Sequence, residues 1–267
     1  MSDSLTYIEN LKRKFHVDED FVFSDQTSPK NITPNDFCKR YLIDLNDSGI
    51  KLPDLINQAF LTVEEQNILE KFSEPYRQKE WFFGRFLAKV AIFECLARLN
   101  LELCDLVRIE IYKHTSKKPN FTILDPILSA MKSLPETTYF SISHKKNLIG
   151  SIGSLSLPVG IDIEALRHFS PTFSKKIFQP SDLDEYRSFL EASGYDINEN
   201  YLKTGIWCLK EATSKAIGLG LSINFKDLGI KYENGKLFVI YDKNHHKYSA
   251  DLIKKDSFLV GMVRKTK

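Results

Sequence analysis

The first feature that bears on the fold of this chain is a faint pattern that occurs twice. Two long amphipathic segments, 76–99 and 201–220, have apolar residues at helical spacing, and each is followed by several short strand-like runs. In each half the last of these runs is apolar and contains glycine, LIGSIGS at 148–154 and FLVGMV at 258–263. This echo predicts a duplicated α+β unit, with the seam near 157–159.

Local signals predict many of the individual elements. Thr62 and Glu65, three residues apart, form a capping box at the start of a helix. Asn234 and Gly235 lie between two apolar runs, which indicates a β-hairpin. Further helices are expected at 3–14 and at 181–193, where Ser181 is the predicted N-cap, and further strands at 39–45, 108–113, 138–143, 148–154, 159–164, 246–255 and 257–265.

The composition excludes several classes of protein. The net charge is only +2, from 37 basic and 35 acidic residues, whereas a general nucleic-acid binder has a larger basic excess. No apolar stretch reaches the roughly 18 residues of a membrane span, and the N-terminus lacks the apolar core of a signal peptide. The four cysteines have no metal-ligand spacing. We therefore expect a cytoplasmic protein that binds neither nucleic acid nor membrane.

Two acidic residues in the segment VGIDIE are the first candidate site. Asp162 and Glu164 are two apart on a predicted strand, so both project from the same face. Two carboxylates on one face repel unless a cation lies between them, and hard carboxylate oxygens suit magnesium. The alternative is the solvated outer face of an edge strand, and for an isolated Asp-x-Glu this alternative is the stronger one.

The helix 201–220 carries a second candidate group. Trp207, Glu211, Lys215 and Gly218 fall on one helix face. Glu211 and Lys215 alone would be a surface ion pair, because this order is favourable on an exposed helix. The tryptophan beside them indicates that the face is partly buried, where a charge pair is costly unless it binds a ligand.

Three further motifs carry groups that could contact an anion. Ser143 and His144 end a predicted strand, and a serine-hydrolase pair is disfavoured because adjacent strand residues point to opposite faces. Lys118 lies in a turn, and Arg85 lies with Lys89 on one face of the helix 76–99. Taken alone, each is an exposed turn or helix exterior. Together with the acids they match the inventory of a metal-bridged polyphosphate site.

At this point the ordered motifs resemble a known family, the 4'-phosphopantetheinyl transferases, and more closely its larger two-lobed class, typified by the surfactin-synthetase activator. The motifs that carry the resemblance are FSISH at 140–144, VGIDIE at 159–164 and WCLKEATSKAIGLGL at 207–221. Weaker matches are LTVEEQNILEKF from 61, GRFLAK at 84–89, SKKPNF at 116–121 and FQPSDLDEY at 178–186. Lys117 stands where the family commonly has glycine, and 1–37 match nothing in it.

The resemblance implies a fold of two similar, pseudo-symmetric lobes with the active site in the cleft between them. It implies an N-terminal extension of unknown role at 1–37, a first lobe at 38–157 and a second lobe at 158–267. It also implies a monomer that works in the cytoplasm.

The resemblance further implies a role for each site residue. Asp162, Glu164 and Glu211 would hold Mg²⁺, while Lys215 and His144 would contact the diphosphate of coenzyme A. The remaining nucleotide phosphates would meet Ser143, Lys118 and Arg85.

The activity implied is that of a holo-acyl-carrier-protein synthase. A serine of an apo acyl or peptidyl carrier protein attacks the β-phosphate of coenzyme A, and adenosine 3',5'-bisphosphate leaves. Glu211 is the candidate base, directly or through a metal-bound water, with Lys215 and Asp162 as its catalytic partners.

Other hypotheses stay open beside this one. The same fold could be a non-catalytic module that binds coenzyme A or a carrier protein. An unrelated magnesium phosphotransferase would be favoured by a GxxxxGK(S/T) loop, which is absent. A pure interaction module leaves Trp207 and Glu211 on one helix face unexplained. The sequence does not say which carrier is served, or whether the chain is part of a larger assembly.

Overall fold

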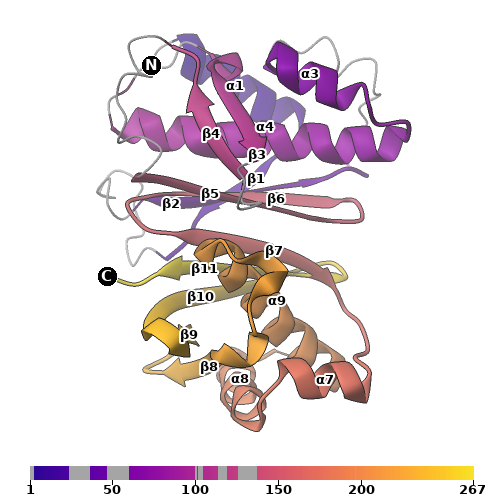
Figure 1. The fold of residues 1–267 in the computed structure, drawn as a ribbon, viewed down its shortest axis with the longest axis vertical. Coiled ribbons are helices and arrows are strands. Elements are labelled where there is room, and N and C mark those ends of the chain that lie inside the picture. The colour runs from indigo at the N-terminus through magenta and orange to yellow at the C-terminus, as the bar shows by residue number, and fades with distance from the viewer. Residues whose placement is uncertain are drawn as a thin grey trace. The chain divides into compact units, whose positions relative to one another are not determined.

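The structure is a computed structural model that describes residues 3–23, 37–46, 60–99, 101, 105–113, 119–125, 137–195 and 197–267. It divides into two compact units, Met1–Ser156 and Leu157–Lys267. Each unit combines helices with antiparallel strands (Figure 1), so the predicted mixture of helix and sheet is confirmed. The pseudo-symmetric lobes and the cleft between them stay predictions.

The first unit packs one long helix against a four-stranded sheet of order β1-β2-β6-β5. Its elements are α1 (Asp3–Lys14), β1 (Asp18–Phe21), β2 (Cys38–Asp44), α3 (Val63–Leu69), α4 (Pro75–Arg98), the short 3-10 helix η3 (Leu106–Arg108), β3 (Ile109–Lys113), β4 (Pro119–Ile123), β5 (Thr138–Lys145) and β6 (Leu148–Leu155). Helix α4 lies along β5 and β6 because its apolar side faces them. Strands β3 and β4 form a separate two-stranded sheet.

Residues 3–22, part of the predicted N-terminal extension, pack into this first unit. The ring of Phe15 meets that of Phe86 edge-on at 5.0 Å. Lys12 Nζ donates to Glu94 Oε1 of α4 at 2.9 Å, and β1 pairs with β2. The extension therefore adds an edge strand and a covering helix to this sheet.

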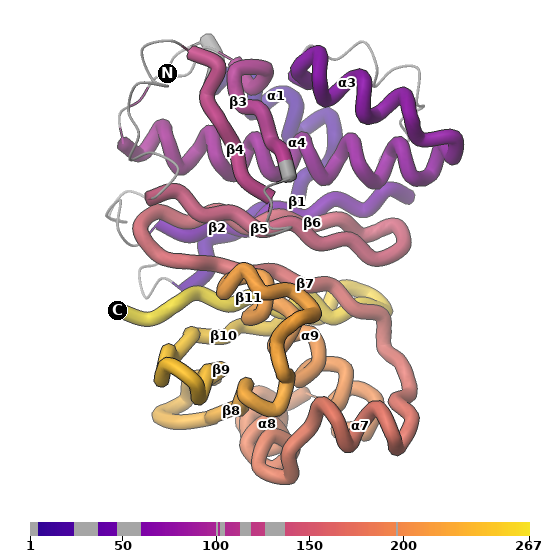
Figure 2. Tube along the Cα trace, in the orientation of Figure 1, coloured from indigo at the N-terminus to yellow at the C-terminus, as the bar shows by residue number. Residues whose placement is uncertain are grey.

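The second unit packs α9 against a five-stranded sheet of order β7-β11-β10-β9-β8. Its elements are β7 (Val159–Ala165), α7 (Pro171–Ile177), α8 (Pro180–Ser193), α9 (Glu199–Ile217), β8 (Leu228–Glu233), β9 (Lys236–Tyr241), β10 (His246–Lys255) and β11 (Phe258–Lys265), with short 3-10 helices η4 (Gly220–Ser222), η5 (Phe225–Asp227) and η6 (Asp242–Asn244). In chain order α9 lies between α8 and β8, and the trace coloured by residue number in Figure 2 can be followed through these elements.

Most element predictions are confirmed, and one cap is wrong. The capping box of α3 is present, with Glu65 N donating to Thr62 Oγ1 at 3.2 Å. The hairpin of β8 and β9 turns at Asn234 and Gly235, both with positive φ. Helix α8 is capped by Gln179 and not by Ser181, because Pro180 occupies the first helical position.

Each unit contains a buried lysine and carboxylate that connect the long helix to a shorter one. In the first unit, Lys89 of α4 contacts Glu65 Oε2 at 2.5 Å and donates to Phe60 O at 2.7 Å. Glu65 also accepts from Ile111 N of β3 at 3.1 Å. Lys89 is fully buried, so the prediction of a helix exterior at this position is wrong.

The second unit repeats these contacts with different residues. Lys210 of α9 contacts Asp182 Oδ2 at 2.6 Å and donates to Ile177 O at 2.9 Å. Asp182 also accepts from Ile230 N of β8 at 2.9 Å. In both units the acid is the third residue of a capped helix and ties a strand to the long helix.

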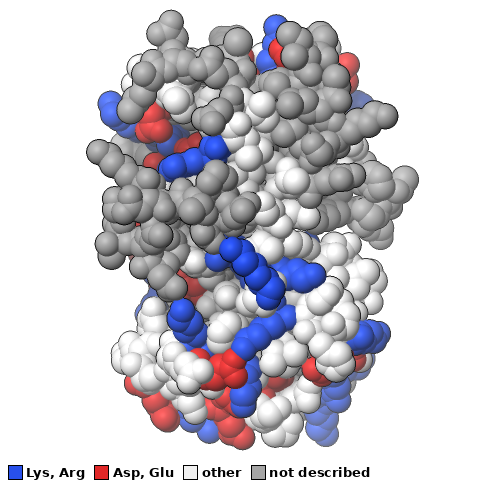
Figure 3. All heavy atoms as spheres, turned by 90° about the vertical axis from the view of Figure 1, so that its left-hand side faces the viewer, with Lys and Arg blue, Asp and Glu red and all other residues white. Residues whose placement is uncertain are grey.

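The described surface has mixed charge. On the face of the second unit that Figure 3 presents, Lys and Arg side chains are interspersed with Asp and Glu, in keeping with the near balance of the composition. Among the described helices, none combines the length and apolar character that crossing a membrane requires.

Candidate active site

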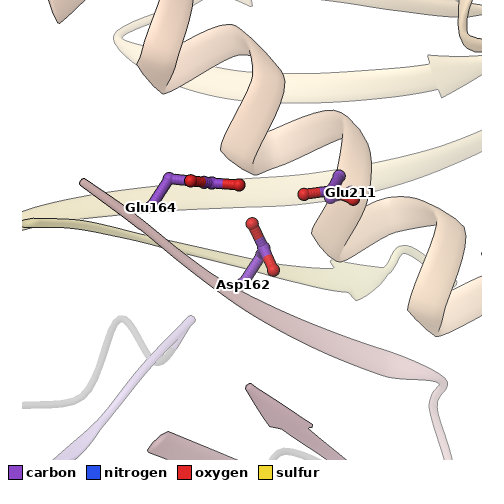
Figure 4. A group of neighbouring side chains, drawn as sticks. All are labelled: Asp162, Glu164 and Glu211. Atoms are coloured by element: carbon purple, nitrogen blue, oxygen red, sulfur yellow. The ribbon is translucent and has the colours of Figure 1, made fainter. Parts of the chain in front are cut away.

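Three carboxylates of the second unit meet between a strand and a helix. Asp162 and Glu164 come from β7 and Glu211 from α9, and one oxygen of each lies within 4.8 Å of the others. Figure 4 shows the three side chains pointing toward one another. Asp162 and Glu164 are only 4% and 5% exposed, so the solvated-face hypothesis for this strand is wrong.

The short distance from β7 to α9 depends on a glycine. A Cβ placed on Gly160 would lie 1.9 Å from the carbonyl oxygen of Ala212 and 3.0 Å from the backbone nitrogen of Ala216. Because both contacts are to helix backbone, no side-chain rotation could relieve them. The glycine of VGIDIE thus lets the strand carboxylates approach Glu211.

The charges of the cluster are only partly balanced. Burial, together with the negative charge of Asp162, raises the pKa of Glu211 to about 8. Lys215 Nζ donates to Asp162 Oδ1 at 2.7 Å and to Ile161 O at 3.1 Å. The alternative of a surface pair between Lys215 and Glu211 was disfavoured by the neighbouring Trp207, and Lys215 forms an ion pair with the strand carboxylate of Asp162.

Trp207 holds one of the acids in place. Its indole Nε1 donates to Glu164 Oε1 at 3.1 Å. Its ring packs against Phe225 at 4.9 Å and Phe173 at 5.3 Å. The sequence placed Trp207 on the face of Glu211, but the hydrogen bond to Glu164 could not be read from helix periodicity.

This set of donors fits a hard divalent cation. Two buried carboxylates and a half-buried one repel one another, and burial of Glu211 together with the charge of Asp162 raises the pKa of Glu211. A cation with oxygen ligands would offset it, and Mg²⁺ is commonly held by few carboxylates with its other positions left to water and phosphate. Asp162, Glu164 and Glu211 are the residues that could hold it.

Two of the predicted anion-contacting residues share a cavity in the first unit. Arg85 and His144 both line a space of about 790 Å³, beside Trp81 and Ile142. The guanidinium of Arg85 lies over the Trp81 ring at 4.7 Å, and burial lowers its pKa. His144 Nδ1 lies 2.7 Å from Glu80 Oε1, a contact that no local pattern predicted.

Ser143 and Lys118 differ from that pair. Ser143 precedes His144 on β5. Ser143 is buried whereas His144 is exposed, because neighbouring residues of a strand point to opposite faces. Lys118 lies outside the described residues. Each unit therefore contributes a separate group: three acids and Lys215 in the second, Arg85 and His144 in the first.

The comparison with family models concerns the second unit. Residues 158–262 match the family model described as the 4'-phosphopantetheinyl transferase superfamily. This part of the chain is therefore similar to that superfamily. The matched range contains β7 and α9, and hence all three carboxylates and Lys215.

A curated relative extends the superfamily match. It is a phosphopantetheinyl transferase of Thraustochytrium sp. (strain ATCC 26185 / S-3), 27% identical over 180 residues. The aligned region is 63% of this chain and 56% of the relative. The chain thus spans little more than half the length of the curated relative that it matches.

Two solved structures of the superfamily are weakly similar. The holo-(acyl-carrier-protein) synthase of Helicobacter pylori, in complex with coenzyme A, is 20% identical with a TM-score of 0.31, covering 40% of this chain and 99% of that one. The holo-(acyl-carrier-protein) synthase of Neisseria meningitidis is 20% identical with a TM-score of 0.33, covering 41% and 98%. Likenesses this weak say nothing of what this chain binds.

Proposed function

We propose that this chain transfers the 4'-phosphopantetheine group of coenzyme A to a serine of an apo carrier protein, with Mg²⁺, and releases adenosine 3',5'-bisphosphate. The observation that carries the proposal is the cluster of buried Asp162 and Glu164 with half-buried Glu211, within the residues that match the superfamily. Coenzyme A is the co-substrate, and an acyl or peptidyl carrier protein is the partner.

The three acids are assigned to the metal. When bound, Mg²⁺ would neutralise charge on the diphosphate and on the oxygen that leaves. Trp207 contributes by orienting Glu164 through its indole N–H. Lys215 contributes by pairing with Asp162, and its ammonium is placed to meet a phosphate oxygen that approaches this carboxylate.

The residues of the first unit are assigned to the nucleotide. His144 would contact the diphosphate, and Arg85, Ser143 and Lys118 would contact the other phosphates. Arg85 and His144 share a cavity, which supports a common ligand for the two. Arginine and histidine both donate hydrogen bonds to phosphate, so the chemistry of the pair agrees with this assignment.

Glu211 is the proposed base for the incoming serine. Once a bound cation displaces its proton, the Glu211 carboxylate is ionised and can accept a proton. The proton of the serine hydroxyl would pass to Glu211, directly or through a water, as the serine oxygen forms its bond to the β-phosphorus. The bond from that phosphorus to the bridging oxygen breaks, and adenosine 3',5'-bisphosphate leaves with the electron pair.

The alternative is a non-catalytic module that binds coenzyme A or a carrier protein with the same groups. Such a module has no need of three clustered carboxylates, two of them buried, since mutual repulsion of buried charge costs stability. The presence of all three acids together with Lys215 favours the enzyme. A monomeric, cytoplasmic enzyme is part of the same proposal, and the carrier protein that it serves is left open.

The test is the intact mass of apo carrier proteins incubated with the chain, coenzyme A and Mg²⁺. We expect a gain of about 340 Da that is abolished by chelation, by Asp162→Ala and by Glu211→Ala. Asp184→Ala is the matched control, because Asp184 is an exposed acid of the same unit. Absence of transfer to a panel of carriers, with coenzyme A still binding in calorimetry, would refute the enzyme and support the binding module.

A further inference from the structure

The two side chains in the contact of His144 with Glu80 differ in burial. The distance from His144 Nδ1 to Glu80 Oε1 is 2.7 Å, and the side chain of Glu80 is 10% exposed against 48% for His144. Burying a carboxylate costs free energy, and the half-exposed imidazole ring contributes little burial of its own to offset that cost. Stability of the fold does not account for such a pair.

We infer that Glu80 is a positioning residue for His144: it holds the imidazole so that Nε2 is directed at a phosphate-bearing ligand. This inference rests on the proposed function for the identity of that ligand, coenzyme A. Glu80 itself touches no reacting atom and acts through the ring.

The surroundings of the pair support this role. Arg77, Glu80 and His144 line both the 790 Å³ cavity and a second, more open space of about 730 Å³. The second space is also lined by Lys145 and Lys146, at the turn between β5 and β6. The ring therefore lines both spaces, where basic side chains stand among carboxylates such as Glu74 and Glu110, and Lys145 and Lys146 are the groups that favour an anion.

The second oxygen of Glu80 is held less firmly. Glu80 Oε2 lies 3.9 Å from Arg77 NH1, whose side chain is largely exposed. Tyr76 lies on the same helix turn, and burial together with the charge of Glu80 raises its pKa. The short contact of Glu80 is thus the one with His144, and it fixes the orientation of the ring.

The chemistry of histidine gives this contact a consequence. In a doubly protonated imidazole ring, Nδ1–H donates to a neighbouring carboxylate and Nε2–H is left to donate to a phosphate oxygen. Buried carboxylates fix the ring of metal-binding histidines by the same contact at Nδ1, although there Nε2 carries no proton. Without Glu80 the ring could rotate, and the hydrogen bond from Nε2–H to phosphate would be lost for part of the time.

The first experiment reads the tautomer directly. Long-range ¹⁵N–¹H correlation spectra of histidine-labelled protein separate protonated from unprotonated ring nitrogens, at an alkaline pH where imidazoles are neutral. We expect His144 to be protonated at Nδ1 in the wild type, and the Nε2–H form to take over in Glu80→Ala. Glu80→Gln should be intermediate, because its amide oxygen still accepts from Nδ1. An unchanged tautomer in Glu80→Ala would overturn the inference.

The second experiment measures the dissociation constant of coenzyme A in a double-mutant cycle. Glu80→Ala and His144→Ala should each weaken binding about tenfold, the loss of one charge-assisted hydrogen bond, and the double variant should weaken it no further. Additive losses would mean that Glu80 acts independently of the ring and would also overturn the inference. Glu110→Gln is the control, since it removes a carboxylate from the same cavity wall without a contact to His144.

The two experiments separate this inference from the proposed function. If the wild type does not bind coenzyme A, the proposed function fails, while the tautomer spectra still decide whether Glu80 orients His144.

Discussion

Replacing Gly160 by alanine should damage both stability and metal binding. The added Cβ would lie 1.9 Å from Ala212 O and 2.8 Å from the Ala212 carbonyl carbon, both in the backbone of α9. Real Cβ atoms keep about 3 Å or more from such atoms, so β7 and α9 would have to separate by roughly 1 Å. Gly160 does not have a positive φ, so the effect is steric and owes nothing to backbone strain.

The cost can be estimated from this displacement. Overpacking of a tight core typically lowers the free energy of unfolding by about 1–3 kcal/mol. Because the contact here is with backbone, we expect about 3 kcal/mol. For a chain of this size the melting temperature should fall by about 6–12 °C. The same movement separates Glu211 from Asp162 and Glu164. Since Mg²⁺ demands near-ideal geometry, its affinity should fall about tenfold or more.

The assay is thermal unfolding by circular dichroism, with calorimetric titration of Mg²⁺ into the folded protein. Gly229→Ala is the matched control, because Gly229 lies on β8 of the same unit and a Cβ there would meet nothing within 4 Å. If Gly160→Ala melts at the same temperature as Gly229→Ala and binds Mg²⁺ equally well, the close approach of strand and helix does not position the acids.

Three further predictions test the interior of the second unit. Lys210→Met should destabilise the protein by about 3–5 kcal/mol in urea unfolding, because the Asp182 carboxylate stays buried without its cation. Trp207→Phe keeps the ring but loses the N–H on Glu164, so Mg²⁺ affinity should fall about tenfold with little change in melting temperature. Mg²⁺ binding at pH 7 should release close to one proton, measured by calorimetry in buffers of different ionisation enthalpy, because the pKa of Glu211 is raised to about 8.

The sign of the proton linkage is fixed by the direction of the pKa shift. The folded value for Glu211 lies above the ordinary value of 4.5, so between the two the folded chain holds a proton that the unfolded chain has lost. Without metal, stability should therefore fall as the pH rises through this range, whereas Mg²⁺ affinity should rise and level off above about pH 8. A metal affinity that is flat from pH 6 to 8 would contradict the assigned ligand.

Sequence reasoning predicted the elements of this fold well wherever the signal is local. The turn at Asn234 and Gly235 needs two residues that tolerate positive φ, and such residues are few. The capping box of Thr62 and Glu65 is likewise complete within four residues. The N-cap of α8 was missed because serine is only a statistical preference there, and Gln179 closes the box with Asp182 instead.

Long-range partners could not be predicted in the same way. The spacing of Asp162 and Glu164 showed that they share a strand face, but only the packing of α9 shows that this face is buried. Lys89 was expected on a helix exterior, because no local pattern in the sequence indicates that it forms a buried ion pair with Glu65. His144 was a candidate from its motif, whereas its partner Glu80 is distant in sequence and has no pattern of its own.

The two units also show why a metal cluster is expected in only one of them. Each long helix carries glycine, then lysine five residues on, then alanine two residues further: Gly84, Lys89 and Ala91 in α4, and Gly205, Lys210 and Ala212 in α9. Both lysines anchor a capped acid, so the two helices use this motif in the same way. Between the lysine and the alanine stands Val90 in the first unit and Glu211 in the second.

The strands of the two units can be compared by position. On β11, Asp162 pairs with the fourth residue, Gly261, and Glu164 pairs with the second, Leu259. On β6, the fourth residue, Ser151, pairs with Tyr41, and the second, Ile149, pairs with Ile43. Tyr41, Ile43 and Val90 are fully buried in the core of the first unit, and none of them carries a carboxylate. The buried contact of a lysine with an acid occurs in both units, so it accounts for the packing of each long helix and not for the carboxylate cluster. The cluster depends instead on Asp162, Glu164 and Glu211, which the second unit alone contributes among the described residues.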